Sequence, residues 1–316
     1  MNRQAATIWL MISLAASAGP APAGGPDAAA PDDLLAGLAW QLALERVGFS
    51  PGVLDGRPGP KTRLATREFQ RVRGLPRTGE LDAATARALG VRPAEALTEY
   101  TVAAADLAQI GPVPTDWREK ARLPRLSYPS LDEALAEKFH CTRALLSHLN
   151  GGANVARLRP GETIDVPNLP PPPEPLLCEH LEVNLAEKVI RAVCSDRLVA
   201  LFHCSIAADR AKRPGGAAQV TVISEEPTYR FDPKMWPEVK GIRDVLFIPP
   251  GPRSPVGLCW IGPSLPGYGI HGSPAPELIG KTGSHGCFRL TNWDALRLAG
   301  MLRVGTPVRF SDTPRS

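Results

Sequence analysis

A run of four prolines at residues 170–173 divides the chain into two parts of different character. Proline has no backbone N–H and a fixed φ, so such a run enters neither a helix nor a central strand and forms a stiff, extended connector. Before the run, apolar residues recur at helical spacing; after it, they gather in short or alternating stretches. We therefore place a linker at 170–176. The 316 residues are enough for two or three separate cores.

The first residues are typical of a secretory signal peptide. Arg3 precedes an apolar run from Ala5 to Ala16, and small residues follow at 16–18 and 21–23. A positive start, a short apolar stretch and a small-residue cleavage site are the parts of such a signal. We expect export to the periplasm or cell wall and removal of residues 1–23, with the cleavage site left open. An uncleaved anchor is the alternative, but the run is short for a bilayer span, so no stable membrane insertion is expected after cleavage.

Composition excludes some classes of protein. The apolar share of 43% and the charged share of 22% are those of a folded globular chain. A net charge of +4 is too small for a nucleic-acid-binding surface. Six cysteines in an exported chain raise the question of disulfides. A two-residue turn at Ser195-Asp196 sets Cys194 opposite Arg197, which argues against a Cys194–Cys204 bridge. The pairing of the other cysteines and the oligomeric state stay open.

Residues 34–91 are predicted to form a small domain of three helices. The first covers 34–48, the second runs from Pro60 to about Arg73, and the third ends at Leu89 with Asp82 as its N-cap. The segment resembles the peptidoglycan-binding domain of bacterial wall enzymes, through Val47-Gly48-Phe49, Pro51-Gly52, Asp55-Gly56, Gly59, Thr62, Phe69-Gln70, Gly74-Leu75, Thr78-Gly79, Asp82, Thr85 and Leu89. The resemblance implies binding to the wall, and a purely structural role is the alternative. If the domain is independent, its removal weakens wall binding and spares the activity of the rest.

The middle segment, residues 97–169, is predicted to be an α+β unit. A strand opens it near Tyr100, a helical pattern covers 131–149, and a turn leads to a closing strand at 164–166. This order resembles a degenerate LysM-type glycan-binding module. An insertion at 106–130 departs from the short module, so a glycan-binding unit and a plain spacer both stay open.

The C-terminal part, residues 177–311, is predicted to be mostly β. Many short apolar runs are separated by Gly, Pro and Asp, and only 293–302 has a good helical pattern, with Asn292 as its expected cap. Such a pattern is typical of a sandwich or a barrel.

Residues capable of covalent chemistry gather in two stretches of this part, His271-Gly272 and Ser284 to Arg289. A thiol is a weak nucleophile until it loses its proton, and an imidazole can take that proton, so Cys287 and His271 form a candidate nucleophile–base pair. Gly286 lets a substrate carbonyl approach, and the amides of Gly286 and Cys287 can stabilise its oxyanion. Arg289 can hold a carboxylate through two parallel hydrogen bonds. The set suits acyl transfer.

These stretches resemble the YkuD family of L,D-transpeptidases, whose signature is a histidine followed, about a dozen residues later, by Ser/Thr-His-Gly-Cys. The matching residues are Pro249-Pro250-Gly251-Pro252, Pro255-Val256-Gly257, Trp260-Ile261-Gly262, Leu265-Pro266-Gly267, Tyr268-Gly269-Ile270-His271-Gly272, Ile279-Gly280, Ser284-His285-Gly286-Cys287 and Arg289-Leu290-Thr291-Asn292-Trp293-Asp294. The resemblance covers 177–311 and implies a mostly β, sandwich-like catalytic domain.

The resemblance also implies roles for single residues. Cys287 matches the nucleophile and His271 the general base, while Ser284, His285 and Gly286 belong to the cysteine motif. The substrate-binding positions that it implies are Arg289, Tyr268 and Gly272. It implies no metal and no cofactor. The expected partner is peptidoglycan, with a stem tetrapeptide as acyl donor and the amine of a diamino acid as acceptor.

Several reactions share this acyl-enzyme. An amine of a second stem peptide gives a 3–3 cross-link, water gives L,D-carboxypeptidase activity, and the amine of a wall protein gives anchoring. Two alternatives of another class are a zinc peptidase, with His271, His285 and Cys287 as ligands, and a wall-binding protein without activity. No motif with a carboxylate at metal-ligand spacing accompanies the two histidines.

Overall fold

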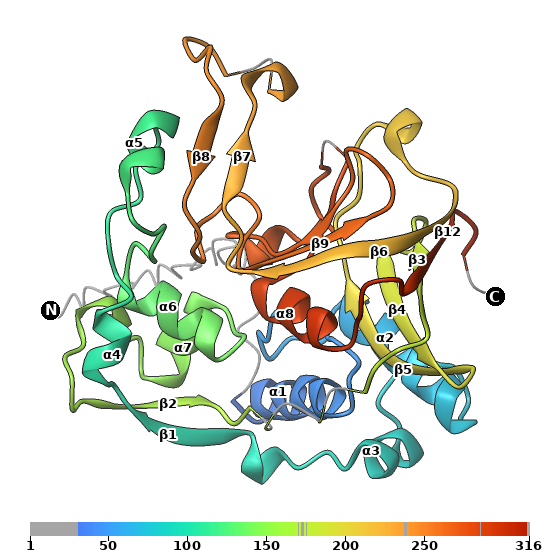
Figure 1. The fold of residues 1–316 in the computed structure, drawn as a ribbon. Coiled ribbons are helices and arrows are strands. Elements are labelled where there is room, and N and C mark those ends of the chain that lie inside the picture. Colours follow the sequence, from blue (N-terminus) through green and yellow to red (C-terminus); the bar gives the residue numbers. More distant parts are fainter. Residues whose placement is uncertain are drawn as a thin grey trace, which may run out of the picture.

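The computed structural model describes residues 31–169, 171, 174, 176–236, 239–284 and 286–314 (Figure 1). The predicted signal peptide at 1–23, His285 and most of the linker prolines lie outside the described residues. Within the described residues, no helix has the length and hydropathy needed to cross a membrane.

The N-terminal domain has the three predicted helices, α1 (Pro31–Arg46), α2 (Pro60–Arg73) and α3 (Ala83–Leu89). Helix α2 ends where Gly74 takes a left-handed conformation with φ 67°, which lets its N–H bond the last carbonyls of the helix. The Asp82 carboxylate accepts the N–H of Thr85 and caps α3, as predicted.

Several residues that carry the resemblance of this domain stabilise its own turns. The Gln70 side chain donates to the hydroxyls of Thr78 and Thr85 and accepts the N–H of Gly79. The Asp55 carboxylate accepts from the Gln41 amide. These residues therefore have a structural role in this chain, and the resemblance by itself does not mark a ligand site.

The middle segment has a strand at each end and four helices between them: β1 (Leu97–Thr101), α4 (Ala104–Leu107), α5 (Trp117–Arg122), α6 (Leu131–Lys138), α7 (Arg143–Leu149) and β2 (Thr163–Pro167). The predicted helical pattern at 131–149 is two helices, because His140 has a φ of 51° between them. Strands β1 and β2 pair antiparallel. Helix α5 lies in the insertion at 106–130, and α4 spans its start.

The C-terminal part is mostly β, as predicted. Its strands are β3 (His180–Asn184), β4 (Val189–Cys194), β5 (Arg197–His203), β6 (Gly216–Glu225), β7 (Tyr229–Phe231), β8 (Leu246–Ile248), β9 (Cys259–Pro263), β10 (Ile270–His271), β11 (Phe288–Arg289) and β12 (Pro307–Ser311). The predicted turn is present: Ser195 and Asp196 have positive φ, and Cys194 pairs with Arg197.

Eight of these strands form one sheet in the order β11-β10-β9-β6-β12-β3-β4-β5. The sheet curls, because the chain just after β5 forms bridges to the opposite edge: Ser205 to Arg289 and Ala207 to Ser284. Helix α8 (Asn292–Gly300) packs beside it, and the central core contains residues such as Phe202, Ile270 and Phe288. The curl brings β11 and the segment before it against the end of β5.

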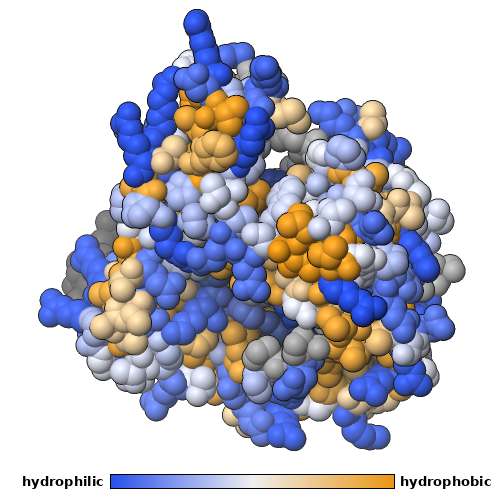
Figure 2. All heavy atoms as spheres, viewed as in Figure 1, coloured by the Kyte–Doolittle hydropathy of each residue, from blue (hydrophilic) through white to orange (hydrophobic). Residues whose placement is uncertain are grey.

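The helical domain shares a core with the sheet. Phe49 and Phe69 pack in one cluster with Val189, Leu198 and Leu201 of β4 and β5. Backbone hydrogen bonds also cross the boundary, from Leu201 N to Gly48 O at 3.0 Å and from Ser50 N to Leu201 O at 2.9 Å. The helices therefore form one side of the folded body (Figure 1), and in the same view the surface mixes polar and apolar patches (Figure 2).

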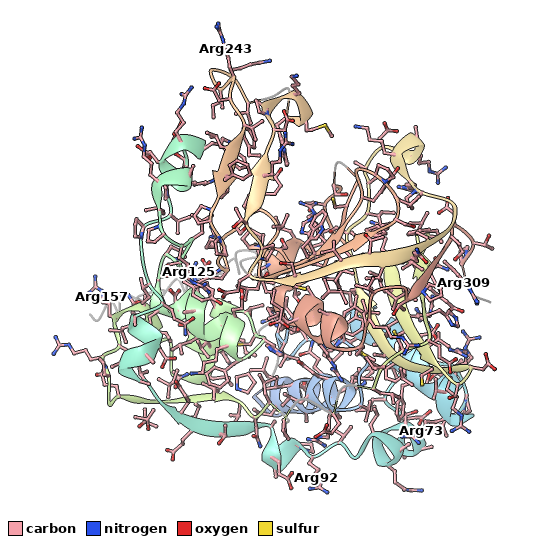
Figure 3. The ribbon with its side chains drawn as sticks, viewed as in Figure 1. Arg73, Arg92, Arg125, Arg157, Arg243 and Arg309 are labelled. Carbon is pink, nitrogen blue, oxygen red and sulfur yellow. The ribbon has the colours of Figure 1, made fainter. Side chains whose placement is uncertain are left out.

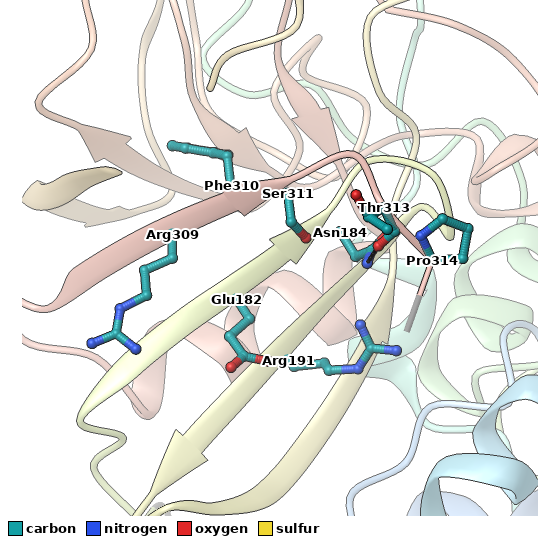
Figure 4. A pocket seen from close by; sticks show the side chains of 8 residues that line it. All are labelled: Glu182, Asn184, Arg191, Arg309, Phe310, Ser311, Thr313 and Pro314. Carbon is teal, nitrogen blue, oxygen red and sulfur yellow. Dashed lines mark hydrogen bonds between the residues drawn. The ribbon is translucent and has the colours of Figure 1, made fainter. Parts of the chain in front are cut away.

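Arg191 of β4 reaches across the same boundary. Its guanidinium binds Glu68 of α2 at 2.8 Å and Glu187 at 2.6 Å, and its side chain is 1% exposed. With Glu182 and Arg309 it also lines a hollow of about 390 Å³ on strands β3, β4 and β12 (Figure 4). Glu68 and Glu187 compensate the charge of Arg191. We therefore assign no ligand to this hollow.

Candidate active site

Strand register brings the predicted site residues to one face of the sheet. Trp260 of β9 pairs with His271 of β10, which pairs with Arg289 of β11. The neighbouring row, Ile261, Ile270 and Phe288, points to the other face and is fully buried in the core. Cys287 directly precedes β11, and because side chains alternate along an extended chain we expect it on the face of Arg289 and His271. The parallel pairing of β10 and β11 places His271 beside Arg289.

Cys287 is half-buried and is a free thiol. Burial raises its pKa to about 11, against the opposing effects of a backbone contact from Gly269 and the charge of Arg289. The resting cysteine is therefore protonated at neutral pH, and its proton must leave when it attacks.

His271 is held in one tautomer. Its Nδ1 lies 2.6 Å from the carbonyl oxygen of Gly272, which can only accept, so Nδ1 carries the proton and Nε2 keeps its lone pair. Burial lowers the pKa of His271 to about 4, so the ring is neutral at pH 7. Its ring stacks on Trp260 with centroids 5.6 Å apart, which fixes its plane. This geometry gives an imidazole ready to accept a proton at Nε2.

Ser284 shapes the turn that presents the thiol. Its hydroxyl donates to the carbonyl of Cys287 at 2.5 Å and accepts the N–H of Gly286 at 3.3 Å. The Gly286 amide, expected from sequence to face an oxyanion, is thus bonded to Ser284 in this structure. His285, between them, lies outside the described residues.

The Arg289 guanidinium forms hydrogen bonds with the loop that precedes Cys287. One Nη atom donates to the Thr282 hydroxyl at 3.2 Å and to the carbonyl of Gly283. Its Nε is buried and has no hydrogen-bond partner among the described residues. The guanidinium therefore retains a donor for another group.

Tyr268 and Gly272 occupy different kinds of position. Tyr268 is half-buried, and its ring lies near the Cα of Gly286. Gly272 is buried, and the Asn292 carboxamide occupies the space that a Cβ would need. Its carbonyl orients His271, so the structure gives Gly272 a positioning contact.

Asn292 is not the helix cap that sequence predicted. The cap of α8 is Thr291, whose hydroxyl accepts the N–H of Asp294 at 3.2 Å. The Asn292 side chain accepts from the N–H of Leu258 at 3.0 Å and donates to Glu137 of α6 at 2.9 Å. The Asn292 side chain is bonded to residues distant in sequence, so the neighbouring Thr291 hydroxyl caps the helix.

Two residues that sequence reasoning missed interact with this site. Tyr229 of β7 is one: burial raises the pKa of its phenol, the hydrogen bond from Trp236 opposes this, and a charge on Cys287 raises it further. Ser205 is the other, since it contacts both ends of the segment that carries Cys287. Neither has a local signal, because each comes from a distant part of the chain. Among the described residues no group of three or more His, Cys, Asp or Glu side chains could hold a metal ion.

Comparison with known proteins identifies two domains. Residues 179–310 match the L,D-transpeptidase catalytic domain of the YkuD family. This part of the chain is a YkuD-type L,D-transpeptidase domain. Residues 38–89 match a peptidoglycan-binding domain. The chain is therefore a multi-domain protein with a helical peptidoglycan-binding domain before a mostly β L,D-transpeptidase domain.

Several proteins named L,D-transpeptidase are similar to it. Bacillus licheniformis YkuD is 29% identical over 182 residues, which cover 58% of this chain and 93% of that protein. Escherichia coli YbiS is 40% identical over 92 residues, 28% of this chain and 29% of that one.

Solved structures of the same name match more loosely. A Xylanimonas cellulosilytica L,D-transpeptidase is 18% identical with a TM-score of 0.38, covering 93% of this chain and 100% of that one. An Enterococcus faecium L,D-transpeptidase mutant is 19% identical with a TM-score of 0.32 and covers 46% of this chain. The present chain spans 53% of the length of that Enterococcus faecium protein.

Proposed function

We propose that this protein forms 3–3 cross-links in peptidoglycan through an acyl-enzyme on Cys287. The observation that carries the proposal is the pairing of His271 with Arg289, two residues after Cys287, within a YkuD-type domain. The chemistry follows from the tautomer of His271. Its free Nε2 takes the thiol proton as sulfur attacks, because the two resting groups are both neutral.

The reaction has two balanced halves. The Cys287 sulfur adds to the carbonyl carbon of the third residue of a tetrapeptide stem, and the thiol proton goes to His271. The C–N bond then breaks, and His271 returns the proton to the amine of the departing D-alanine, leaving a thioester. An acceptor amine attacks the thioester, loses a proton to His271, and the C–S bond breaks with protonation of the thiolate.

The remaining residues have supporting roles in this proposal. Ser284 and Gly286 shape the cysteine turn, Gly272 holds His271, and Tyr268 borders the place where a stem peptide would lie. The buried Nε of Arg289 is a donor for a substrate carboxylate or carbonyl. For His285 the proposal rests on the family resemblance. Water and a protein amine are the alternative acceptors of the same thioester.

The setting of the reaction is also part of the proposal. Domains that bind and act on peptidoglycan suggest the cell wall or periplasm as the place of action. We infer export through a signal peptide at 1–23. N-terminal sequencing of the protein from a periplasmic extract tests it: a first residue near 24 supports cleavage, and an intact Met1 contradicts it.

The deciding experiment is mass spectrometry of the full chain incubated with disaccharide-tetrapeptides. A dimer lighter than two monomers by one D-alanine is expected, with loss of product in Cys287→Ala. Cys194→Ala is the matched control, because Cys194 is the other half-exposed cysteine among the described residues. Tripeptide alone would favour water as acceptor. Loss of activity with a chelator would favour a zinc peptidase, since an acyl-enzyme on Cys287 needs no metal, and no turnover at all would favour a binding protein.

A further inference from the structure

The β7–β8 hairpin is too small to be stable by itself. Only three residue pairs join its strands, from Tyr229 with Ile248 to Phe231 with Leu246. Isolated two-stranded hairpins are at best marginally stable in water. Phe231 and Ile248 are nonetheless completely buried, so another part of the chain must cover them. In Figure 1 the hairpin projects from the body of the protein with α5 beside it.

The covering part is the insertion in the middle segment. Trp117 of α5 stacks on Phe231, with ring centroids 4.1 Å apart and planes at 21°. Leu126, in the same insertion, is 0% exposed and belongs to the same cluster as Phe231 and Ile248. We call residues 116–126 the brace segment. It supplies the apolar surface that the hairpin lacks.

Polar contacts attach the brace segment to both ends of the hairpin. Arg125 donates from its two Nη atoms to the two carboxylate oxygens of Glu226, at 2.7 and 2.6 Å, just before β7. Leu126 N bonds Pro250 O at 2.9 Å, just after β8. Arg118 donates to the carbonyl of Gly241 between the strands at 2.8 Å. Figure 3 shows Arg125 at the foot of the hairpin.

The same cluster holds Tyr229, the first residue of β7. Tyr229 accepts a hydrogen bond from the Trp236 indole at 2.8 Å, and Trp117 lies 6.4 Å from the Tyr229 ring and 6.1 Å from the Trp236 ring. The hairpin also continues from a strand beside the active site, because β7 follows β6, whose Ser224 pairs with Trp260, and the Trp260 ring stacks on His271. A displacement of Trp117 would therefore disturb the hairpin at the end of the strand that supports His271.

We propose that the brace segment holds the β7–β8 hairpin against the active site and that Trp117 is a positioning residue for the reaction at Cys287. The insertion that departs from the LysM pattern then serves the catalytic domain. The kinetic part of this inference rests on the proposed transpeptidation, and its structural part does not.

The test compares Trp117→Ala, Trp117→Phe and Arg125→Ala in the full chain. Arg122→Ala is the matched control, because Arg122 is exposed on the same helix and makes no hydrogen bond or ion pair to the hairpin among the described residues. Three quantities are measured: hydrogen exchange of the hairpin amides, the alkylation rate of Cys287 by iodoacetamide from peptide mapping, and kcat and KM. We expect faster exchange at 229–231 and 246–248 and a kcat/KM about tenfold lower in Trp117→Ala. Trp117→Phe should keep the hairpin exchange rate and kcat/KM close to those of the wild type, because phenylalanine can still stack on Phe231. Arg122→Ala should match the wild type in both quantities.

Unchanged hairpin exchange and Cys287 alkylation in Trp117→Ala would overturn the inference. If that variant unfolds globally, seen as fast exchange in α1 and β4, Arg125→Ala decides, because its ion pair with Glu226 is half-exposed and its loss leaves the core intact. Unchanged hairpin exchange and kinetics in Arg125→Ala would then overturn it. If the wild type makes no cross-links, exchange and alkylation still test the brace, and only the proposed function fails.

Discussion

Glu68 of the helical domain and Arg191 of the curled sheet form an ion pair of 2.8 Å in which the side chains are 4% and 1% exposed. Loss of Glu68 would leave the buried Arg191 guanidinium with Glu187 as its remaining carboxylate partner among the described residues, and loss of a partner from a buried pair is strongly destabilising. We expect Glu68→Gln to lower the free energy of unfolding by about 3 kcal/mol, measured by urea denaturation. Arg71→Ala removes the more exposed partner of Glu68 and should cost no more than about 1 kcal/mol. Equal losses in the two variants would contradict the buried pair as the stronger contact.

Removal of the helical domain should disable the rest of the chain. A truncation of residues 34–91 would expose Val189, Leu198 and Leu201 and leave Arg191 without Glu68. The sequence alone led to the opposite expectation, that activity would survive. We now expect aggregation or loss of the cooperative melting transition, measured by calorimetry. A truncated protein that melts cooperatively and acylates at the wild-type rate would show that the interface is dispensable.

Ser205 should be needed for full activity although it does not touch the thiol. Its hydroxyl accepts the N–H of Gly280 at 2.9 Å, and its backbone exchanges two hydrogen bonds with Arg289. It thus fixes both ends of the segment that carries Cys287. Ser205→Ala leaves a partly buried N–H without an acceptor, at about 1 kcal/mol, and we expect kcat to fall about tenfold.

Ser254→Ala is the control for this variant. Ser254 is also buried, but its hydroxyl has no hydrogen-bond partner among the described residues. Its loss should leave kcat and stability close to those of the wild type. Similar kcat values for the two alanine variants would exclude a positioning role for Ser205.

The free thiol should react slowly at neutral pH. Burial raises the pKa of Cys287 to about 11, so the folded site favours the protonated thiol, and the reactive thiolate accumulates only as pH rises. Iodoacetamide alkylation of Cys287 without substrate should increase about tenfold per pH unit between about pH 7 and 10. N-acetylcysteine, the control, should level off at lower pH. A rate already constant near pH 7 would indicate a resting thiolate–imidazolium pair instead.

Loss of the imidazole should reduce turnover strongly and leave the fold intact. We expect His271→Ala to lower kcat by about 10²–10⁴-fold, the scale of general-base catalysis. Acylation measured at high pH, where the thiol ionises without help, should recover part of the loss. A uniform defect at every pH would point to a structural role for His271.

Local features of the fold were predictable from sequence. The ends of α2, the Asp82 cap and the turn at Ser195-Asp196 each depend on residues a few positions apart, so neighbouring side chains and glycine conformations decide them. The cysteine turn is local as well, since Ser284 bonds the carbonyl of Cys287 three residues on, but these hydrogen bonds were not predicted. The Asn292 prediction failed because distant partners competed for a polar side chain.

The sequence by itself determined the family, the nucleophile–base candidates and the division into a helical and a strand-rich part, because motifs and periodicities are local. Only the tertiary structure decided that the two parts share a core, that Ser205 meets Arg289, and that Trp117 covers Phe231. These contacts join residues far apart along the chain. They arise from the curl of the sheet and the packing of apolar surfaces against it, which no short stretch of sequence specifies.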